Sequence, residues 1–221
     1  MSTTKVETSI KPKSEGLFSV KNRKLLTDPL DGDNPVTVQI LGVCSALAVT
    51  VKMEPALFMT LGLTFVTAFS NLLISMLRNT IPSRIRIIVQ LAVVSLFVII
   101  VDQVLKAYFY EISMKLSVFV GLIITNCIVM GRLEAYAMAN KPWPSFLDGI
   151  GNGLGYGLIL MVVAFIREVL GSGSIFGMKI FEKIGFPYIN NGVMMIPAGA
   201  CIIVGLLIWA QRARNGYREA E

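Results

Sequence analysis

Long apolar runs, separated by short polar or glycine-rich segments, make up most of the chain from residue 35 onward. Runs of this length with almost no charge are typical of helices that cross a lipid bilayer. The six runs are Pro35 to Val51, Pro55 to Leu77, Ile85 to Phe109, Leu116 to Gly131, Ile150 to Leu170 and Gly192 to Ala210. The pattern predicts an all-α, polytopic membrane protein with six transmembrane helices.

The first and fourth runs are shorter than the others. At about 1.5 Å per residue they span roughly 25 Å, whereas the hydrocarbon core of a bilayer is roughly 30 Å thick. The order short, long, long therefore occurs twice, and it divides the chain into halves at about 34–110 and 115–211. Because each half crosses the membrane an odd number of times, the second half is inverted relative to the first. We expect two inverted three-helix repeats with short or broken first helices.

The segments outside the runs define the remaining organisation. Residues 1–33 are polar and basic, which predicts a flexible arm with a short interfacial piece at 17–26, and residues 212–221 form a polar tail. The Pro142-Trp143-Pro144 segment and the stretch 171–191 are interpreted as turns. With the N-terminus inside, fourteen of the 20 Lys and Arg residues lie on the cytoplasmic side. Both termini are predicted to be cytoplasmic.

The composition narrows the function further. The chain of 221 residues is 54% hydrophobic and 15% charged, which excludes a water-soluble enzyme. It contains no histidine, so a Ser-His-Asp triad, a His-ligated haem and a Rieske centre are also excluded. The net charge is +6, but the basic residues are distributed by membrane topology and form no basic face with interleaved aromatic residues. No nucleic-acid partner is therefore expected.

Two cysteines occupy corresponding places in the two halves. Cys44 lies in the first short run and Cys127 in the second, while Cys201 has no counterpart. They are interpreted as small buried hydrophobes, as a disulfide, or as ligands of an iron–sulfur cluster. A cluster needs four ligands, so a second chain would have to supply two thiolates. The neighbouring Ser45 and Asn126 are candidates to donate hydrogen bonds to cluster sulfurs or to join helices.

Three acidic residues at membrane depth are candidates for an ion pathway: Asp102, Asp148 and Glu168. Each also has a structural interpretation. Asp102 is spaced i,i+4 from Lys106, Glu168 adjoins Arg167, and Asp148 stands where it would cap a helix.

Glycines in the fifth run form two ladders with a four-residue period. One ladder is Gly149, Gly153 and Gly157, and the other is Gly151 and Gly155. Such ladders allow close backbone approach on two faces, and they are also compatible with a broken helix. The run lacks the strand that a nucleotide-binding fingerprint requires, so that function is not expected.

Four segments carry a family resemblance: Leu41 to Thr50, Ile124 to Ala135, Asp148 to Gly153 and Arg167 to Gly171. They closely resemble the family of D subunits of bacterial Na⁺-translocating NADH:quinone oxidoreductases, most strongly over Asn34 to Gly171. The E subunit of the Rnf ferredoxin:NAD oxidoreductase complex is similar in its Thr-Asn-Cys-Ile-Val and Arg-Glu signatures.

The resemblance implies a [2Fe-2S] cluster inside the membrane, held by two cysteines of this chain and two of a paralogous, inverted-topology E subunit. Cys44 and Cys127 match the two cysteine positions of the family. The resemblance further implies an electron relay coupled to Na⁺ export, in a six-subunit complex embedded in the lipid of the bacterial inner membrane. No flavin and no complete substrate site are expected on this chain. The alternatives are the Rnf subunit, or a cation-conducting or scaffold subunit without its own redox centre.

Overall fold

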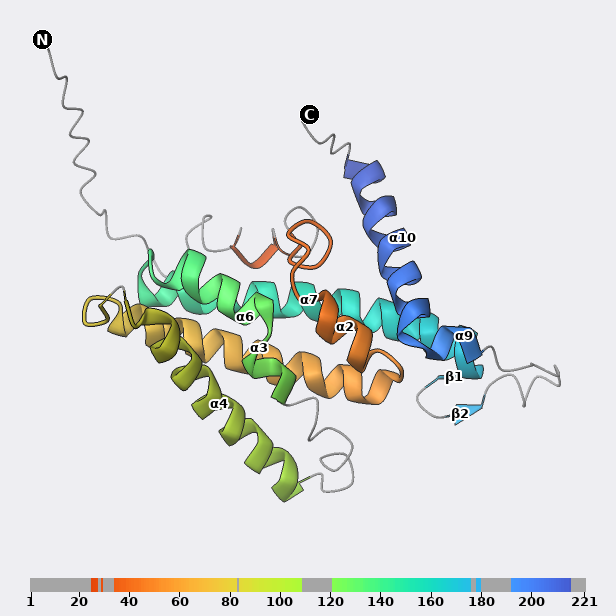
Figure 1. The fold of residues 1–221 in the computed structure, drawn as a ribbon, viewed down its shortest axis with the longest axis horizontal. Helices are drawn as coiled ribbons and strands as arrows, with labels where there is room; N and C mark the ends of the chain where they lie inside the picture. Colours follow the sequence, from red (N-terminus) through yellow and green to blue (C-terminus); the bar gives the residue numbers. More distant parts are fainter. Residues whose placement is uncertain are drawn as a thin grey trace, which may run out of the picture.

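The computed structural model describes residues 25–27, 29, 34–82, 84–108, 121–175, 178–179 and 192–215. These residues are helical apart from turns and one antiparallel pair of two-residue strands (Figure 1). The elements are α2 (Val43–Val49), α3 (Met53–Leu77), α4 (Arg86–Tyr108), α6 (Cys127–Arg132), the π-helix η2 (Leu133–Ala137), α7 (Pro142–Ser172), β1 (Ser174–Ile175), β2 (Met178–Lys179), α9 (Gly192–Met195) and α10 (Pro197–Asn215). Among the described residues, α3, α4 and α7 are long and apolar enough to cross a membrane, and α10 is a shorter apolar helix.

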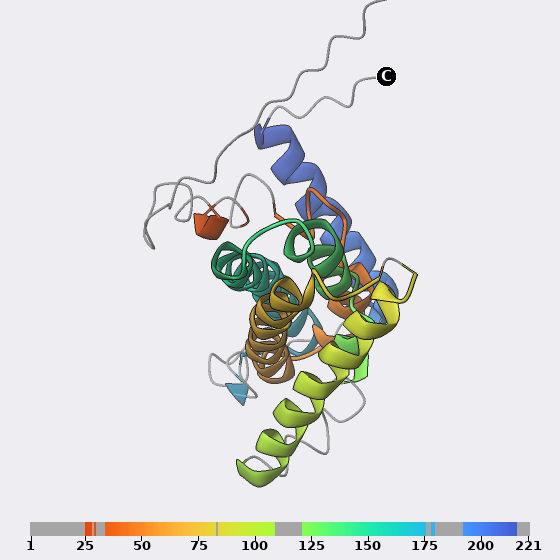
Figure 2. The ribbon, with the colours of Figure 1, turned by 90° about the vertical axis from the view of Figure 1, so that its left-hand side faces the viewer.

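An antiparallel pair of helices, α3 and α7, forms the centre of the molecule (Figures 1 and 2). Glycines of α7 allow this close packing, since a Cβ on Gly149 or Gly153 would lie 2.7 Å from a backbone Cα of α3. Real Cβ atoms do not approach backbone so closely, so a side chain there would force the helices apart. The contacts join Gly149 to Ala68, Gly153 to Thr64 and Gly157 to Thr60.

The second glycine ladder faces the segment that precedes α2. Gly151 lies against the backbone of Leu25, and Gly155 lies against Pro29. Asn34 is fully buried and its Nδ2 donates to the carbonyl of Gly155 over 3.0 Å. Packing on two faces of α7 is therefore confirmed, and the alternative of a broken helix is wrong because α7 is continuous. Leu25, Leu26 and Pro29, assigned from the sequence to the arm, pack on this face.

Two helices diverge from the central pair. Helix α4 makes its main contact with α3 and diverges from the pair (Figure 2). Most of its large apolar side chains are exposed. Helix α10 contacts α2, α7 and α9 and points away from the pair at the opposite end (Figure 1). The order of a short helix with a cysteine, a long helix and a third helix is thus seen in both halves. The crossing of the membrane by six inverted-repeat spans stays a prediction.

Both short runs are broken, as the sequence predicted. In the first, only Val43–Val49 is α-helical, and the preceding residues form turns closed by bonds such as Leu41 N to Pro35 O at 2.8 Å. In the second, residues 121–124 make one helical turn, the helix stops at Thr125 and Asn126, and α6 then begins at Cys127. Residues 116–120 of this run lie outside the described residues.

Two predicted boundaries are wrong for a shared reason, the position of proline. The Pro142-Trp143-Pro144 segment is the first turn of α7, where a backbone N–H has no intrahelical partner and proline is tolerated. The last run is interrupted at Ile196, because the residue before Pro197 is disfavoured in helical conformation.

Candidate functional site

The two cysteine-bearing segments meet beside α7. Cys44 is the second residue of α2 and Cys127 is the first residue of α6. Asn126, which precedes Cys127, donates from Nδ2 to Ser45 Oγ over 3.1 Å, and Ser45 follows Cys44. A hydrogen bond between sequence neighbours of the two cysteines therefore holds the two segments together across the halves.

A buried tyrosine anchors this contact to the central pair. The Tyr156 hydroxyl lies 2.8 Å from Ser45 Oγ, and Ser45 Oγ donates to the Gly42 carbonyl over 2.8 Å. Asn126 Oδ1 also accepts from Ile128 N at 3.1 Å and so caps α6. Tyr156 is fully buried, and Ser45 and Asn126 are nearly so. These polar groups, satisfied by one another, form the floor of the candidate site.

The backbone before α2 adopts a conformation that brings it close to α6 and α7. Gly42 has φ 75°, and a Cβ there would lie 2.6 Å from Ile128 Cδ1 and 3.2 Å from the Tyr156 ring, so glycine meets both a backbone and a space requirement. Ile40 has φ 54°, which costs a β-branched residue of order 1–3 kcal/mol. Backbone strain of this kind persists only where the surrounding packing imposes the conformation.

The three cysteines are free and exposed in the isolated chain. Cys44 and Cys127 therefore do not pack in the core of this chain itself, and no disulfide joins them. Cys201 is also exposed, on α10. No cluster of three or more His, Cys, Asp or Glu side chains that could hold a metal ion occurs among the described residues.

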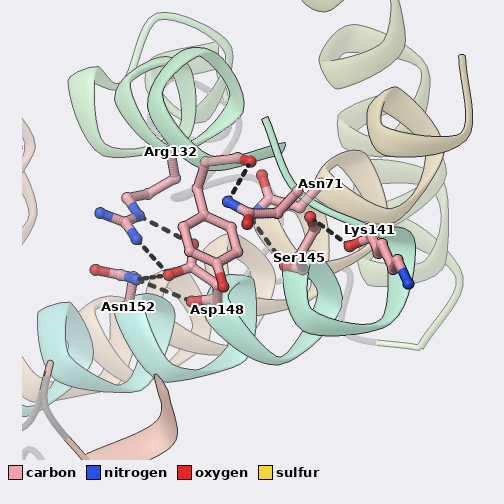
Figure 3. Close-up of polar contacts among 8 residues, drawn as sticks. Asn71, Arg132, Lys141, Ser145, Asp148 and Asn152 are labelled. Carbon is pink, nitrogen blue, oxygen red and sulfur yellow. Dashed lines mark hydrogen bonds and ion pairs between the residues drawn. The ribbon is translucent and has the colours of Figure 1, made fainter. Parts of the chain in front are cut away.

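Asp148 takes part in a buried ion pair rather than capping a helix. It lies in the second turn of α7 with 1% exposure, and Arg132 of α6 reaches it with Nε, at 2.9 Å from Oδ2, and with Nη2 (Figure 3). Asn152 Nδ2 donates to Asp148 Oδ1 over 3.1 Å. Because α7 starts at Pro142 and not later, Asp148 is internal to the helix, and the capping interpretation is wrong.

Unpartnered oxygen atoms lie near this ion pair. Asn71 of α3 donates from Nδ2 to the Ser145 carbonyl of α7 over 3.2 Å, as Figure 3 shows. Its Oδ1 and the Oδ1 of Asn152 are buried without a hydrogen-bond partner. A buried unpaired acceptor costs about 1–3 kcal/mol, so these groups require an explanation.

The other two acidic candidates have structural contacts. Asp102 forms the predicted i,i+4 pair with Lys106 on the exposed part of α4. Glu168 accepts from Met53 N over 2.7 Å and so satisfies the first residue of α3. Arg167 is 2% exposed and donates to carbonyls at the ends of α2 and α9, so the interpretation of Arg167 and Glu168 as an interfacial pair is wrong.

Sequence reasoning missed two residues of the site. Tyr156 was hidden among the glycines of the fifth run, and its only signal is a hydroxyl within a glycine-rich apolar stretch. Arg132 was counted among the cytoplasmic loop charges, although its position one turn after Cys127 directs it to α7. Neither partner was predictable without knowing where α7 begins.

Comparisons with known proteins match most of this chain to one family of membrane proteins. The family model described as "Rnf-Nqr subunit, membrane protein" matches residues 22–208, which extends beyond the segment of strongest resemblance at both ends. A protein of Aeromonas salmonicida is 60% identical over 195 residues, covering 87% of this chain and 93% of the relative. A protein of Shewanella sp. strain ANA-3 is 60% identical over 192 residues, covering 86% and 91%. Both relatives are named as the D subunit of a Na(+)-translocating NADH-quinone reductase.

Proposed function

The chain belongs to the Rnf-Nqr family of membrane subunits, and from this premise we propose that it serves as the D subunit of a Na⁺-translocating NADH-quinone reductase. In this proposal Cys44 and Cys127 hold half of a [2Fe-2S] cluster, and the paralogous E subunit supplies the other half. The observation that carries it is the hydrogen bond from Asn126 to Ser45, which joins the two segments while both thiols stay exposed. The names of the relatives favour this assignment over the E subunit of the Rnf complex.

The donor set fits such a cluster. Two thiols on one chain supply half of the four ligands, and their exposure leaves them open to a second chain. When bound, the cluster would take up and release one electron near the middle of the membrane. The described residues of this chain do the positioning: Ser45 and Asn126 fix the two segments, and the α3–α7 pair supports them from behind. The bacterial inner membrane and two cytoplasmic termini belong to the same proposal.

Replacing Cys44 tests the proposal directly. Cys44→Ala in the purified complex should remove two iron atoms and two acid-labile sulfides per complex, because an alanine cannot complete a four-ligand set. The measurements are iron and sulfide analysis together with electron paramagnetic resonance of the reduced complex.

The matched control is Cys201→Ala, which removes an exposed thiol from α10 and should leave the iron and sulfide contents unchanged. If Cys44→Ala retains the iron and sulfide of the wild type, the redox role is rejected and a scaffold role, for which the cysteines are dispensable, is favoured instead.

A contribution to Na⁺ passage is a second candidate function, supported by the surroundings of Asp148. A carboxylate with 1% exposure and the unpartnered amide oxygens of Asn71 and Asn152 nearby offer the hard oxygen ligands that Na⁺ prefers. Arg132 neutralises this carboxylate in the present conformation, so passage of a cation at Asp148 requires that Arg132 move away. Asp102, half-buried and paired with Lys106, has a weaker claim.

Neutralising Asp148 should change the sodium dependence of turnover. We expect Asp148→Asn to raise the Na⁺ concentration for half-maximal quinone reduction by about tenfold, the effect of losing one charge-assisted ligand. Turnover is measured against Na⁺ concentration in proteoliposomes, with Asp102→Asn as the comparison. An unchanged Na⁺ dependence in Asp148→Asn would remove Asp148 from the ion pathway.

A further inference from the structure

The hydrogen bonds beneath the two cysteines have a determined direction. Ser45 Oγ has one proton to donate and two lone pairs to accept with. It donates to the Gly42 carbonyl, and the amide nitrogen of Asn126 can only donate to it. If the serine proton is used on Gly42, the remaining contact, at 2.8 Å, requires the Tyr156 hydroxyl to be the donor. Ser45 Oγ is then fully satisfied, and Tyr156 supplies the last of its three bonds.

Tyr156 also connects the α3–α7 pair to both cysteine segments. It lies on α7 between Gly153 and Gly157, whose missing side chains let α7 pack closely on α3. Its ring borders Gly42, which precedes the α2 segment. Through Ser45 its hydroxyl reaches Asn126, which precedes Cys127. One buried side chain thus touches the α2 segment and, by one further bond, the α6 segment.

We propose that Tyr156 is a positioning residue that, through its hydrogen bond to Ser45, sets the relative placement of the Cys44 and Cys127 thiols. This inference rests on the proposed function, because the thiols need a defined separation only if they share a metal centre. Removing a hydrogen bond that connects both cysteine segments should change how the two thiols meet that centre. Removing a group that only fills space would instead lower the stability of the fold. Outer partners of this kind tune the potential of a metal site.

Removing one oxygen atom tests the inference. Tyr156→Phe keeps the ring against Gly42 and should preserve the iron and sulfide contents of the purified complex. The reduced cluster is expected to show a shifted midpoint potential and an altered electron paramagnetic resonance spectrum. Quinone reduction per cluster should slow by about two- to tenfold, the effect of one lost hydrogen bond.

A double-mutant cycle separates positioning from general destabilisation. Ser45→Ala should produce a similar shift of the potential, and the double variant should shift no further than the larger single one, because both changes remove the same bond. Tyr108→Phe, at an exposed tyrosine of α4, is the matched control and should behave as the wild type.

Two results would overturn the inference while the proposed function stands. One is a wild-type potential and spectrum in Tyr156→Phe, even if less complex is recovered. The other is a shift that simply adds to that of Ser45→Ala. Failure of the proposed function has a separate signature, since Cys44→Ala would then lose no iron.

Discussion

Cys127→Ala should abolish NADH-driven quinone reduction while the complex still oxidises NADH with a soluble electron acceptor. In the proposed cluster three thiolates cannot complete a four-ligand set, so under that proposal electrons should stop before they cross the membrane. The loss should exceed the roughly 10–100-fold that follows removal of an outer partner of a metal site. The measurement is a pair of steady-state rates on one preparation, one with quinone and one with the soluble acceptor.

Local structure explains why this loss should not come from misfolding. Cys127 is exposed and is the first residue of α6, so alanine leaves no cavity and is compatible with the helix. The cap from Asn126 to Ile128 N does not involve the thiol. Cys201→Ala should retain both rates. Equal losses of both rates in Cys127→Ala would indicate disassembly of the complex, and unchanged quinone reduction would show that Cys127 lies off the electron path.

The apolar runs predicted the helix bounds well where apolar length alone determines the helix. Helix α4, at Arg86–Tyr108, follows the run from Ile85 almost residue for residue, since apolar length alone determines such a span. The start of α7 was missed because the segment from Pro142 to Gly149 is too polar to belong to the apolar run, although it is helical. The first run was predicted to be short or broken, but the position of its break was not predicted, since the apolar residues before α2 pack without being helical.

The chemistry of the candidate site stays a prediction, and its contacts could not be predicted from the sequence. The placement of Cys44 and Cys127 left three interpretations open, and the family resemblance favoured thiolate ligation. The bond between Ser45 and Asn126 spans 81 positions and depends on how α2 and α6 dock on α7, which no local pattern encodes. Asp148 and Arg132 illustrate the same limit, because a charge at membrane depth signals a need for a partner without identifying it.

Arg167 should carry one of the largest single contributions to the stability of the described fold. Its guanidinium has five N–H donors, and all are engaged by uncharged oxygens. Nη1 donates to Leu47 O at 3.1 Å and to Thr50 Oγ1 at 2.8 Å, at the C-terminal end of α2. Nε and Nη2 donate to the carbonyls of Met194, Met195 and Ile196, at the end of α9. Helix C-termini favour a positive charge, so this arginine ties two helix ends to α7.

Arg167→Met is therefore expected to cost about 3–5 kcal/mol, because it leaves several buried carbonyls without donors. The temperature at which half of the detergent-solubilised complex loses this chain should fall by about 10 °C. The stability of Arg167→Lys should lie between that of the wild type and that of Arg167→Met. An ammonium keeps the charge but lacks the rigid fork with which the guanidinium reaches both helix ends. Arg84→Met, at an exposed arginine, is the matched control and should remain within about 0.5 kcal/mol of the wild type. Equal stability of the Arg167→Met and Arg84→Met complexes would show that α2 and α9 are held in place by other contacts.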